Sequence, residues 1–359
     1  MNTPTYHKAL QVLDGIDPSK YAAERNYLEK STRLSVYITR GILTLPQIKE
    51  HLLLKFTTNQ CYKLIFELAW REYWQREWRV RGDAIFWDIK RSQENVESEL
   101  LPAAILNAST RVEVLDAGIR QLYETGYVHN HMRMWLSGLI CNIAHTHWRH
   151  PADWMYYHLL DGDPASNDLS WQWVAGTFSS KTYLPAQENI NKYSKTKQFN
   201  TYLDQSYEML AEMPTPDILS ERQATNLTWT APETQELIID KSKPTLLYHS
   251  FWLNSQWYKD VDASRILVLE PHWFKAHPVS QKVMDSILKI ALEIPGMQVY
   301  VGDISSLKAT LNPNIKYINH PSLNGWPGVA EDMPMLFPDV PLKSFGSFMS
   351  YWKQCEKTL

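Results

Sequence analysis

The sequence contains little cysteine and little glycine, and it has no long apolar run. Three cysteines stand among 359 residues, at Cys61, Cys141 and Cys355. This number and spacing argue against a disulfide framework and fit a reducing, cytoplasmic compartment. Three thiolates are also one too few for an iron–sulfur cluster. No uncharged stretch approaches the roughly 18 apolar residues of a membrane span, and the N-terminus lacks the apolar core of a secretion signal.

An excess of positive charge is absent as well. The formal net charge is −3 and the isoelectric point is about 6.5. These values argue against a protein that binds long duplex nucleic acid through a large basic face, but they leave room for a local basic patch beside one extruded base. Tryptophan, in contrast, is abundant, with 15 residues against 13 glycines. Core packing accounts for most of these aromatic side chains, but not for the tryptophans in polar segments, which could stack against bases or relay electrons.

Apolar residues recur at helical spacing from about residue 27 to residue 180. This period predicts an all-helical region without strands. Within it, Gly126 is expected to end one helix, and residues 132–147 are expected to form one long buried helix. Residues 1–25 are polar and are expected to form a lead-in to this region.

The period changes after about residue 240. Short runs of β-forming residues alternate there with one amphipathic segment, which predicts a small parallel α/β unit. The expected strands are 245–249, 266–270 and 297–303, and the expected helix is 279–292. The unit contains no G-x-G-x-x-G or Walker loop, so no phosphate site is indicated. The fold class expected for the chain is mainly α, with a helical domain at residues 1–225 and a small α/β domain at residues 240–359.

One predicted helix carries an unusual combination of side chains on one face. Glu67, Trp70, Arg71 and Trp74 are spaced at i, i+3, i+4 and i+7, so they share that face. A flavin-like or base-like ring could stack on a tryptophan there, with the polar groups at its rim. An ordinary amphipathic helix with a surface Glu–Arg pair explains the same spacing equally well.

A second helix repeats the pattern with Asn130, Arg133 and Met134. Arg133 can hold a carboxylate through two parallel hydrogen bonds. Asp161 and Asp163 are spaced so that one can pair with Arg133 while the other accepts a hydrogen bond from a ligand N–H. A buried ion pair together with a helix N-cap at Asp163 is an equal alternative.

Asn167 follows these carboxylates in the same segment. Its neutral amide can donate to and accept from a redox-active ring nitrogen without fixing the charge of that ring. The alternative is that Asn167 simply caps a helix.

Three tryptophans, Trp148, Trp171 and Trp173, lie in a segment that is otherwise rich in Asp, Asn and Ser. As a chain, they could pass an electron from solvent to a flavin. Core packing is the simpler explanation for any one of them alone. The nearby H-x-H pairs place their rings on different sides of a helix, so no metal site is expected.

From about Tyr21 to Asn191, the sequence resembles the FAD-binding domain of photolyases and cryptochromes. The resemblance rests on five segments: Ser31–Ser35 (similar to Thr-Ser-x-Leu-Ser), Glu67–Tyr73 (E-L-x-W-R-E-[FY]), Leu115–Leu122 (V-D-A-x-M-R-Q-L), Gly126–Met134 and Asp161–Trp173. It implies that FAD is bound by Tyr21, Ser31, Thr32, Leu34, Ser35, Arg71, Asn130, Arg133, Asp161, Asp163 and Asn167. In this arrangement Asn167 faces flavin N5.

The resemblance also implies a reaction. Glu67, Trp70, Asn130, Met134 and Trp173 would line a pocket for a flipped-out cyclobutane pyrimidine dimer, and Trp171 and Trp148 would be the inner and middle members of a tryptophan relay. The expected activity is light-driven repair of cyclobutane dimers in ultraviolet-damaged DNA by electron transfer from reduced FAD. The pairing of Asn130 with Met134 favours these dimers over (6–4) lesions. The alternatives are a cryptochrome-like blue-light photoreceptor without repair activity and a flavin-binding scaffold with neither function.

The chain departs from the family pattern in three respects. It begins almost at the flavin domain. Its C-terminal unit resembles part of the family's N-terminal antenna domain, moved to the other end of the chain. Several strands of that domain are missing, and their loss argues against an antenna chromophore. Residues 345–353 are similar to the short F-x-x-F-W-K segment of that domain.

Two DNA-contacting arginines are lost, one in the segment around Lys181 and one replaced by His131. This loss predicts a preference for single-stranded or unpaired lesions. The outermost relay tryptophan is also missing, and Trp87 or Trp154 could replace it.

Overall fold

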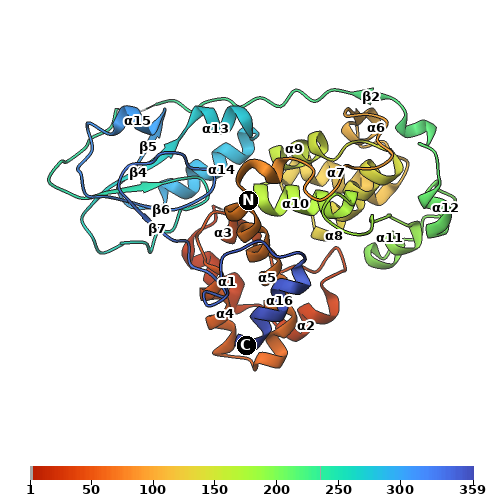
Figure 1. Ribbon diagram of the computed structural model, residues 1–359, viewed down its shortest axis with the longest axis horizontal. Coiled ribbons are helices and arrows are strands. Elements are labelled where there is room, and N and C mark those ends of the chain that lie inside the picture. Colours follow the sequence, from red (N-terminus) through yellow and green to blue (C-terminus); the bar gives the residue numbers. More distant parts are fainter. Residues whose placement is uncertain (1–2, 235) are drawn as a thin grey trace.

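A group of helices and a parallel β-sheet make up the molecule (Figure 1). The computed structural model describes residues 3–234 and 236–359. The sheet and its helices lie on one side, helices α6 to α12 lie on the other, and α1 to α5 and α16 lie between and below them in this view. Within the described ranges, no helix combines the length and the apolar character that crossing a bilayer requires.

Twelve helices precede the sheet in the described part of the chain. They are α1 (Tyr6–Asp14), α2 (Pro18–Glu24), α3 (Ser35–Thr39), α4 (Leu45–Leu53), α5 (Thr58–Arg81), α6 (Ala103–Leu106), α7 (Glu113–Thr125), α8 (Asn130–Gly138), α9 (Arg149–His158), α10 (Pro164–Ala175), α11 (Gln187–Ser194) and α12 (Tyr207–Ala211). Helix α7 ends as predicted at Gly126, which takes a left-handed φ of 69°. Helix α10 packs against both α5 and α8, so it lies at the centre of this part of the molecule.

The expectation that the first 25 residues form a mere lead-in was wrong. Helices α1 and α2 fold there, and Ala9 and Leu13 are buried in the core. Each helix has a side-chain cap, because Thr5 accepts a hydrogen bond from Lys8 N and Asp17 accepts hydrogen bonds at the start of α2. These caps are visible in the sequence as signals of helix starts.

The expectation of one long helix at 132–147 was also wrong. Helix α8 ends at Gly138, and a single π-helical turn (Leu139–Ile143) follows, in which Ala144 N donates to Leu139 O at 2.8 Å. The chain then leaves the helix through His145, whose φ is 47°. A hydrophobic period cannot distinguish this i→i+5 turn from an α-helix.

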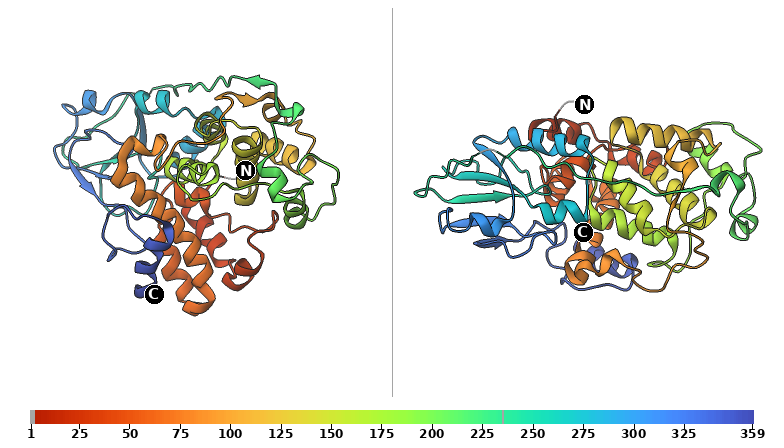
Figure 2. Two further views of the ribbon diagram at one scale, coloured as in Figure 1. Left: turned by 45° about the vertical axis from the view of Figure 1, so that its right-hand side comes forward. Right: turned by 90° about the horizontal axis from the view of Figure 1, so that it is seen from above.

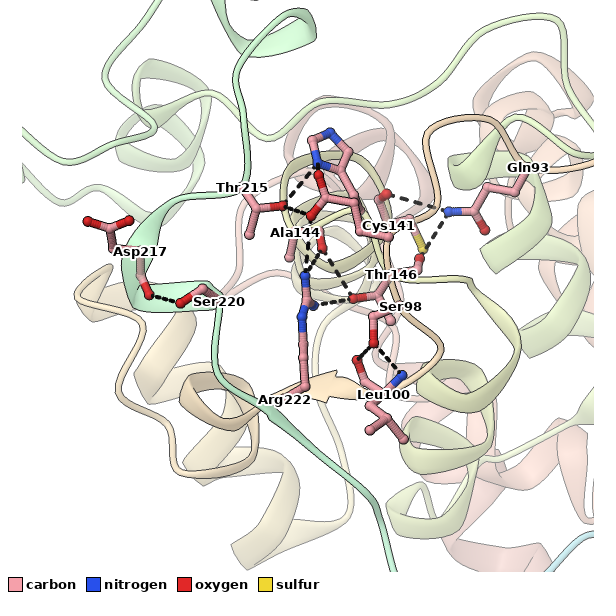
Figure 3. A network of polar contacts seen from close by, with 12 residues as sticks. Gln93, Ser98, Leu100, Cys141, Ala144, Thr146, Thr215, Asp217, Ser220 and Arg222 are labelled. Carbon is pink, nitrogen blue, oxygen red and sulfur yellow. Dashed lines mark hydrogen bonds and ion pairs between the residues drawn. The ribbon is translucent and has the colours of Figure 1, made fainter.

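The helical part is not free of strands, contrary to the prediction. A two-residue strand β1 (Leu101–Pro102) pairs antiparallel with β2 (Arg222–Gln223) from the connecting segment. Arg222 fastens this segment to the helices, since its guanidinium donates to Thr146 Oγ1 at 2.7 Å (Figure 3). Gln93 holds the same turn by donating to Thr146 O at 2.9 Å.

The three predicted strands are present, in a sheet with two more strands that were not predicted. The strands are β3 (Thr245–Tyr248), β4 (Ser264–Leu269), β5 (Met297–Val301), β6 (Ile315–Ile318) and β7 (Val329–Glu331), and the helices are α13 (Pro271–Ala276), α14 (Gln281–Leu292) and α15 (Ile304–Leu307). All strands are parallel in the order β5-β4-β3-β6-β7. This is a doubly wound order that reverses between β3 and β6. With five strands instead of three, the α/β unit is larger than the predicted fold class, mainly α, implies.

The chain returns to the first helices at its end. Helix α16 (Phe348–Cys355) packs beside α5, and both views that show it place the blue C-terminal segment against the orange helix (Figures 1 and 2). The residues from 333 onward therefore leave the sheet and cover one side of α5.

Candidate functional site

Arg133 and Asp161 form an ion pair on the side of α8 that faces α10. One guanidinium nitrogen of Arg133 lies 2.9 and 2.8 Å from the two carboxylate oxygens of Asp161, which is buried. Burial opposes ionisation of Asp161, but Arg133, the Ser35 hydroxyl and Arg71 outweigh it and hold the pKa of this carboxyl below its ordinary value. Asp161 is therefore a fixed negative charge.

Asp163 caps helix α10. One of its carboxylate oxygens accepts a hydrogen bond from Ser166 N at 2.7 Å, and the other accepts one from Gln75 Nε2. Arg71 lies 3.7 Å away. Asp163 is thus the N-cap of α10, as one of the two predicted alternatives had it. Both of its carboxylate oxygens already accept a hydrogen bond from the protein.

Asn167 is oriented by its neighbours on α9 and α10. Its amide N–H groups donate to Ala152 O at 3.0 Å and to Asp168 Oδ1 at 2.8 Å. Among the described residues, none donates a hydrogen bond to its oxygen. Asp168 in turn pairs with Arg149 at 2.7 Å, and burial raises the pKa of Asp168 to about 7. The amide therefore presents its oxygen as the group left for a ligand.

The turn before α3 gathers hydroxyl groups and uncapped N–H groups. Ser31 Oγ accepts from the Tyr127 hydroxyl at 3.0 Å, and Thr32 Oγ1 accepts from Leu34 N at 3.4 Å. No side chain caps the first N–H groups of α3. Arg33 takes a φ of 57°, and its guanidinium lies 4.0 Å from the centre of the Tyr127 ring.

These donors fit a dinucleotide cofactor with a phosphate bridge. Backbone N–H groups and hydroxyls suit phosphate oxygens, and the fixed Arg133–Asp161 pair offers polar anchors nearby. Ser166, on the same turn of α10 as Asp163, has a buried hydroxyl without a hydrogen-bond partner among the described residues. Buried polar groups normally have partners, and this hydroxyl is free to bond to a ligand atom.

Glu67 and Trp70 form a partly exposed wall on α5. Glu67 pairs with Arg25 at 3.3 Å and with Lys63 at 2.7 Å. Burial, followed by the charge of Glu67, raises the pKa of Tyr21. The indole of Trp70 stacks on Phe348 of α16.

The opposite side of the site is formed by α8 and the end of α10. Asn130 is exposed, with its amide nitrogen 3.8 Å from the sulfur of Met134. Trp173 is partly exposed near the end of α10. Because α10 packs against both α5 and α8, the two predicted faces and the Asp161–Trp173 segment belong to one region of the molecule.

The two expected relay tryptophans are buried in the same core cluster. Trp171 is 2% exposed and Trp148 is fully buried. The Trp148 indole N–H donates to Asp88 at 2.6 Å, and the neighbouring Trp87 is 72% exposed. Trp154, the other replacement considered for the outer position, is 1% exposed and donates to Tyr123. Of the two, only Trp87 reaches solvent.

Sequence reasoning missed three residues that support the site. Thr39 donates to Asp161 O at 3.0 Å and accepts from Arg71 at 2.6 Å. Arg40 is buried and donates to Leu160 O at 2.8 Å and Ser250 O at 3.2 Å, so it joins the helices to the loop after β3. Gln75 holds Asp163. Of these three, only Arg40 could have been found from the sequence, because a charged residue inside the apolar run Val36–Leu43 must find partners when that run is buried.

A cavity lies behind this support, between the helices and the sheet. It is partly open to solvent. Thr39, Arg71 and Asp163 line it from the helices. Phe251 and His320, which follow β3 and β6, line it from the sheet.

A small cluster of positive charges lies beside Trp173. The Lys90 ammonium is 4.6 Å from the centre of the Phe178 ring, and the Arg81 guanidinium is 5.7 Å from it. Arg91 donates to Gly176 O at 2.8 Å. Burial, followed by the charges of Arg81 and Arg91, lowers the pKa of Lys90. Arg81 is paired with Glu77 at 2.7 Å, so Lys90 and Arg91 supply the positive charge of this cluster.

One carboxylate–histidine group elsewhere has atoms close enough for a metal. Glu270, His272 and Asp303, at the end of the sheet, offer ligand atoms within 4.8 Å of one another. Glu270 already accepts hydrogen bonds from Trp326 and from Ile304 N. This group is remote from the helical site, and its buried carboxylate is already satisfied.

Comparisons with known proteins identify the family of the helical part. Residues 63–244, half of the chain, match the family model described as "FAD binding domain of DNA photolyase". The chain is 28% identical over 207 residues to a chloroplastic/mitochondrial cryptochrome DASH of Ostreococcus tauri, covering 54% of this chain and 36% of that protein. It is 33% identical over 117 residues to a deoxyribodipyrimidine photo-lyase of Agrobacterium fabrum, covering 33% and 22%.

Solved structures give a weaker match. A cryptochrome of Synechocystis sp. PCC6803 superposes with a TM-score of 0.46 and 21% identity, covering 53% of this chain and 43% of that one. The chain spans only about a fifth to a third of the length of the two curated relatives above.

Proposed function

This chain belongs to the family defined by the FAD-binding domain of DNA photolyase, and on that premise we propose that it repairs cyclobutane pyrimidine dimers in light. FAD is the cofactor of this domain. When bound and reduced, it supplies the electron that light releases and takes it back at the end. The two carbon–carbon bonds between the pyrimidines break, and no net oxidation or reduction results.

The residues that hold FAD in this proposal are those with suitable donors or acceptors around the Arg133–Asp161 pair. They are Tyr21, Ser31, Thr32, Leu34, Ser35, Arg71, Asn130, Arg133, Asp161, Asp163 and Asn167. Ser166 joins them through its unpartnered hydroxyl. Asn167 would present its amide oxygen to the ring, because Ala152 and Asp168 already occupy its N–H groups.

The dimer would lie between the two walls. Trp70 and Trp173 stack its rings, Glu67 accepts a hydrogen bond from a pyrimidine N–H, and Asn130 and Met134 complete the pocket. The observation that supports this proposal is the position of α10, which packs against both α5 and α8, the helices that carry the residues of the two proposed walls.

Single-stranded or unpaired DNA is the proposed form of the substrate. Flipping a base out of a duplex costs unstacking energy, which is smallest in a single strand. The net charge of −3 provides no broad basic face, whereas the cluster of Lys90, Arg81 and Arg91 suits a few phosphates beside the pocket.

Dark binding tests this substrate assignment. The holoprotein is titrated with a fluorescent single-stranded oligonucleotide that contains one thymine dimer, with the same strand undamaged, and with both as duplexes. We expect the dimer strand to bind at least tenfold more tightly than the undamaged strand, and Met134→Ala to reduce this preference. Equal binding of damaged and undamaged strands would contradict a dimer pocket.

A blue-light receptor is the second candidate. The buried pair of Trp171 and Trp148, with exposed Trp87 next to the Trp148 partner Asp88, suits light-driven reduction of a flavin from solvent. A receptor needs this path but no dimer pocket. The receptor is favoured if the protein binds damaged and undamaged strands equally, and if Trp148→Phe slows the photoreduction of its flavin.

A further inference from the structure

The C-terminal helix α16 supplies the ring on which Trp70 lies. The ring centroids of Phe348 and Trp70 are 3.7 Å apart and the planes differ by 10°. The other aromatic neighbours of Trp70 on α5 are less aligned, since Trp74 is tilted by 43° and Tyr73 is nearly edge-on. Phe348 is 3% exposed, while Trp70 is partly exposed. One face of the indole is therefore covered, and its plane is set by a ring from the far end of the chain.

Buried charges of α5 anchor the segment that carries Phe348. Arg76 is fully buried and donates to Val340 O at 2.9 Å and to Phe337 O. Glu72 accepts from Phe337 N at 3.1 Å and from the Tyr351 hydroxyl at 2.7 Å. Both charges lie within two turns of Trp70 and also pair with each other at 3.1 Å. Their remaining hydrogen-bonding atoms are satisfied by the C-terminal segment, and buried polar groups left without partners are unfavourable, so this segment is held tightly.

A second anchor fixes the chain just before α16. Glu77 is fully buried and accepts from Phe345 N and from Ser344 Oγ, each at 2.9 Å. Phe348 thus lies between fixed points at Phe345 and Tyr351. The position of its ring follows from these anchors rather than from a flexible surface contact.

We propose that Phe348 is a positioning residue that fixes the plane of Trp70, so that the exposed part of the indole meets a flipped-out base. Residues 333–359 then complete the substrate pocket, although they lie far from it in sequence. This inference rests on the proposed function for the role of Trp70, and it adds the residue that orients it. The competing explanation is that Phe348 only fills the core.

Three variants separate orientation from core filling. Phe348→Leu keeps an apolar side chain but loses the flat face, whereas Phe348→Tyr keeps the face. Phe345→Leu makes the same chemical change on the same segment, at a ring whose aromatic contact is with Tyr351. All three are measured as holoproteins, with the flavin absorbance per protein as a check of folding.

We expect Phe348→Leu to weaken binding of the single-stranded dimer oligonucleotide about tenfold, as the loss of one base-stacking surface does. Phe348→Tyr and Phe345→Leu should stay within about twofold of the wild type. The proposal is overturned if Phe348→Leu binds normally, or if Phe345→Leu loses as much affinity.

A spectroscopic measurement keeps this test independent of the substrate. The contribution of Trp70 to the near-ultraviolet circular dichroism is the difference between the wild type and Trp70→Phe. It should be lost in Phe348→Leu and retained in Phe348→Tyr; a signal that survives in Phe348→Leu contradicts the proposal. If the wild type binds no dimer, the proposed function fails, and this signal alone decides whether Phe348 orders Trp70.

Discussion

Arg133 and Asp161 illustrate how single residues hold this site. The pair was predicted from spacing, and the structure shows both carboxylate oxygens of a buried Asp161 within 3 Å of the same guanidinium nitrogen. Asp163 caps α10, and its contact with FAD stays a prediction. The ion pair could be predicted because a charged side chain that is buried in the core needs a partner of opposite charge nearby.

Replacing Arg133 by methionine should leave Asp161 as an unpaired buried carboxylate. We expect a loss of about 3 kcal/mol in the free energy of unfolding and loss of FAD during purification. Urea unfolding and the flavin absorbance at equal protein concentration measure the two effects. Arg120→Met, on the surface of α7, is the control and should retain FAD; an unchanged flavin content in Arg133→Met would contradict the assignment.

The buried histidine of the loop after β6 predicts a pH dependence of stability. Burial, followed by the charge of Arg79, lowers the pKa of His320 from 6.5 to about 3. As the pH falls below 6.5, the unfolded chain gains a proton at this position that the folded protein does not, so stability is lost. The protonation of His320 in the unfolded chain alone should lower the free energy of unfolding by about 2 kcal/mol between pH 7 and pH 5.

Urea unfolding at several pH values measures this loss. His320→Asn should show a shallower decrease than the wild type. His272→Asn makes the same change at a half-exposed position and should follow the wild-type curve. A His320→Asn curve parallel to that of the wild type would show that this histidine does not titrate on unfolding.

At the scale of helices and strands, the hydrophobic period located α7, α14 and three strands correctly. It failed at Leu139–Ile143, because a π-turn buries the same side chains as an α-turn would. It also failed at β6, which has only four residues with buried isoleucines at its two ends, and at β7, which is short and largely exposed. Helices α1 and α2 were missed although Thr5 and Asp17 are visible cap residues.

The end of α8 depends on a small residue. A side chain at Gly138 would place its Cβ 2.8 Å from Tyr183 O and 3.1 Å from a Pro185 carbon. Gly138→Ala should therefore push away the segment after Trp173 and destabilise the protein by about 1–3 kcal/mol. Gly346→Ala, with no atom within 4 Å of the new Cβ, is the matched control in thermal unfolding. Equal midpoints would contradict this close packing.

The loop that carries Lys90 and Arg91 should contribute to binding of single strands. Neutralising either residue with glutamine should weaken binding and reduce the slope of log K against log salt by about 0.7 per lost phosphate contact. Lys308→Gln, on the sheet unit, should change neither quantity. Salt titrations of an undamaged oligonucleotide measure both, and an unchanged slope in Lys90→Gln and Arg91→Gln would remove this cluster from the binding surface.

At the scale of the whole molecule, the two ends of the chain meet at α5. Its Glu72, Arg76 and Glu77 are buried and find partners in residues 336–351. No local pattern reveals such a pairing, because the partners are mostly backbone groups about 260 residues away. The same limit applies to Thr39, Arg40 and Gln75, whose roles emerge only when distant segments meet.

The central claim is that α5, α8 and α10 form one site for FAD and a pyrimidine dimer. It is tested most directly by reducing the flavin-loaded protein, adding a single-stranded oligonucleotide with one thymine dimer, and following the recovery of thymine absorbance under blue light and in darkness. We predict recovery in light only, faster than with the duplex, and strongly reduced by Glu67→Gln. The absence of recovery in light, from a protein that holds FAD and photoreduces, would contradict the claim.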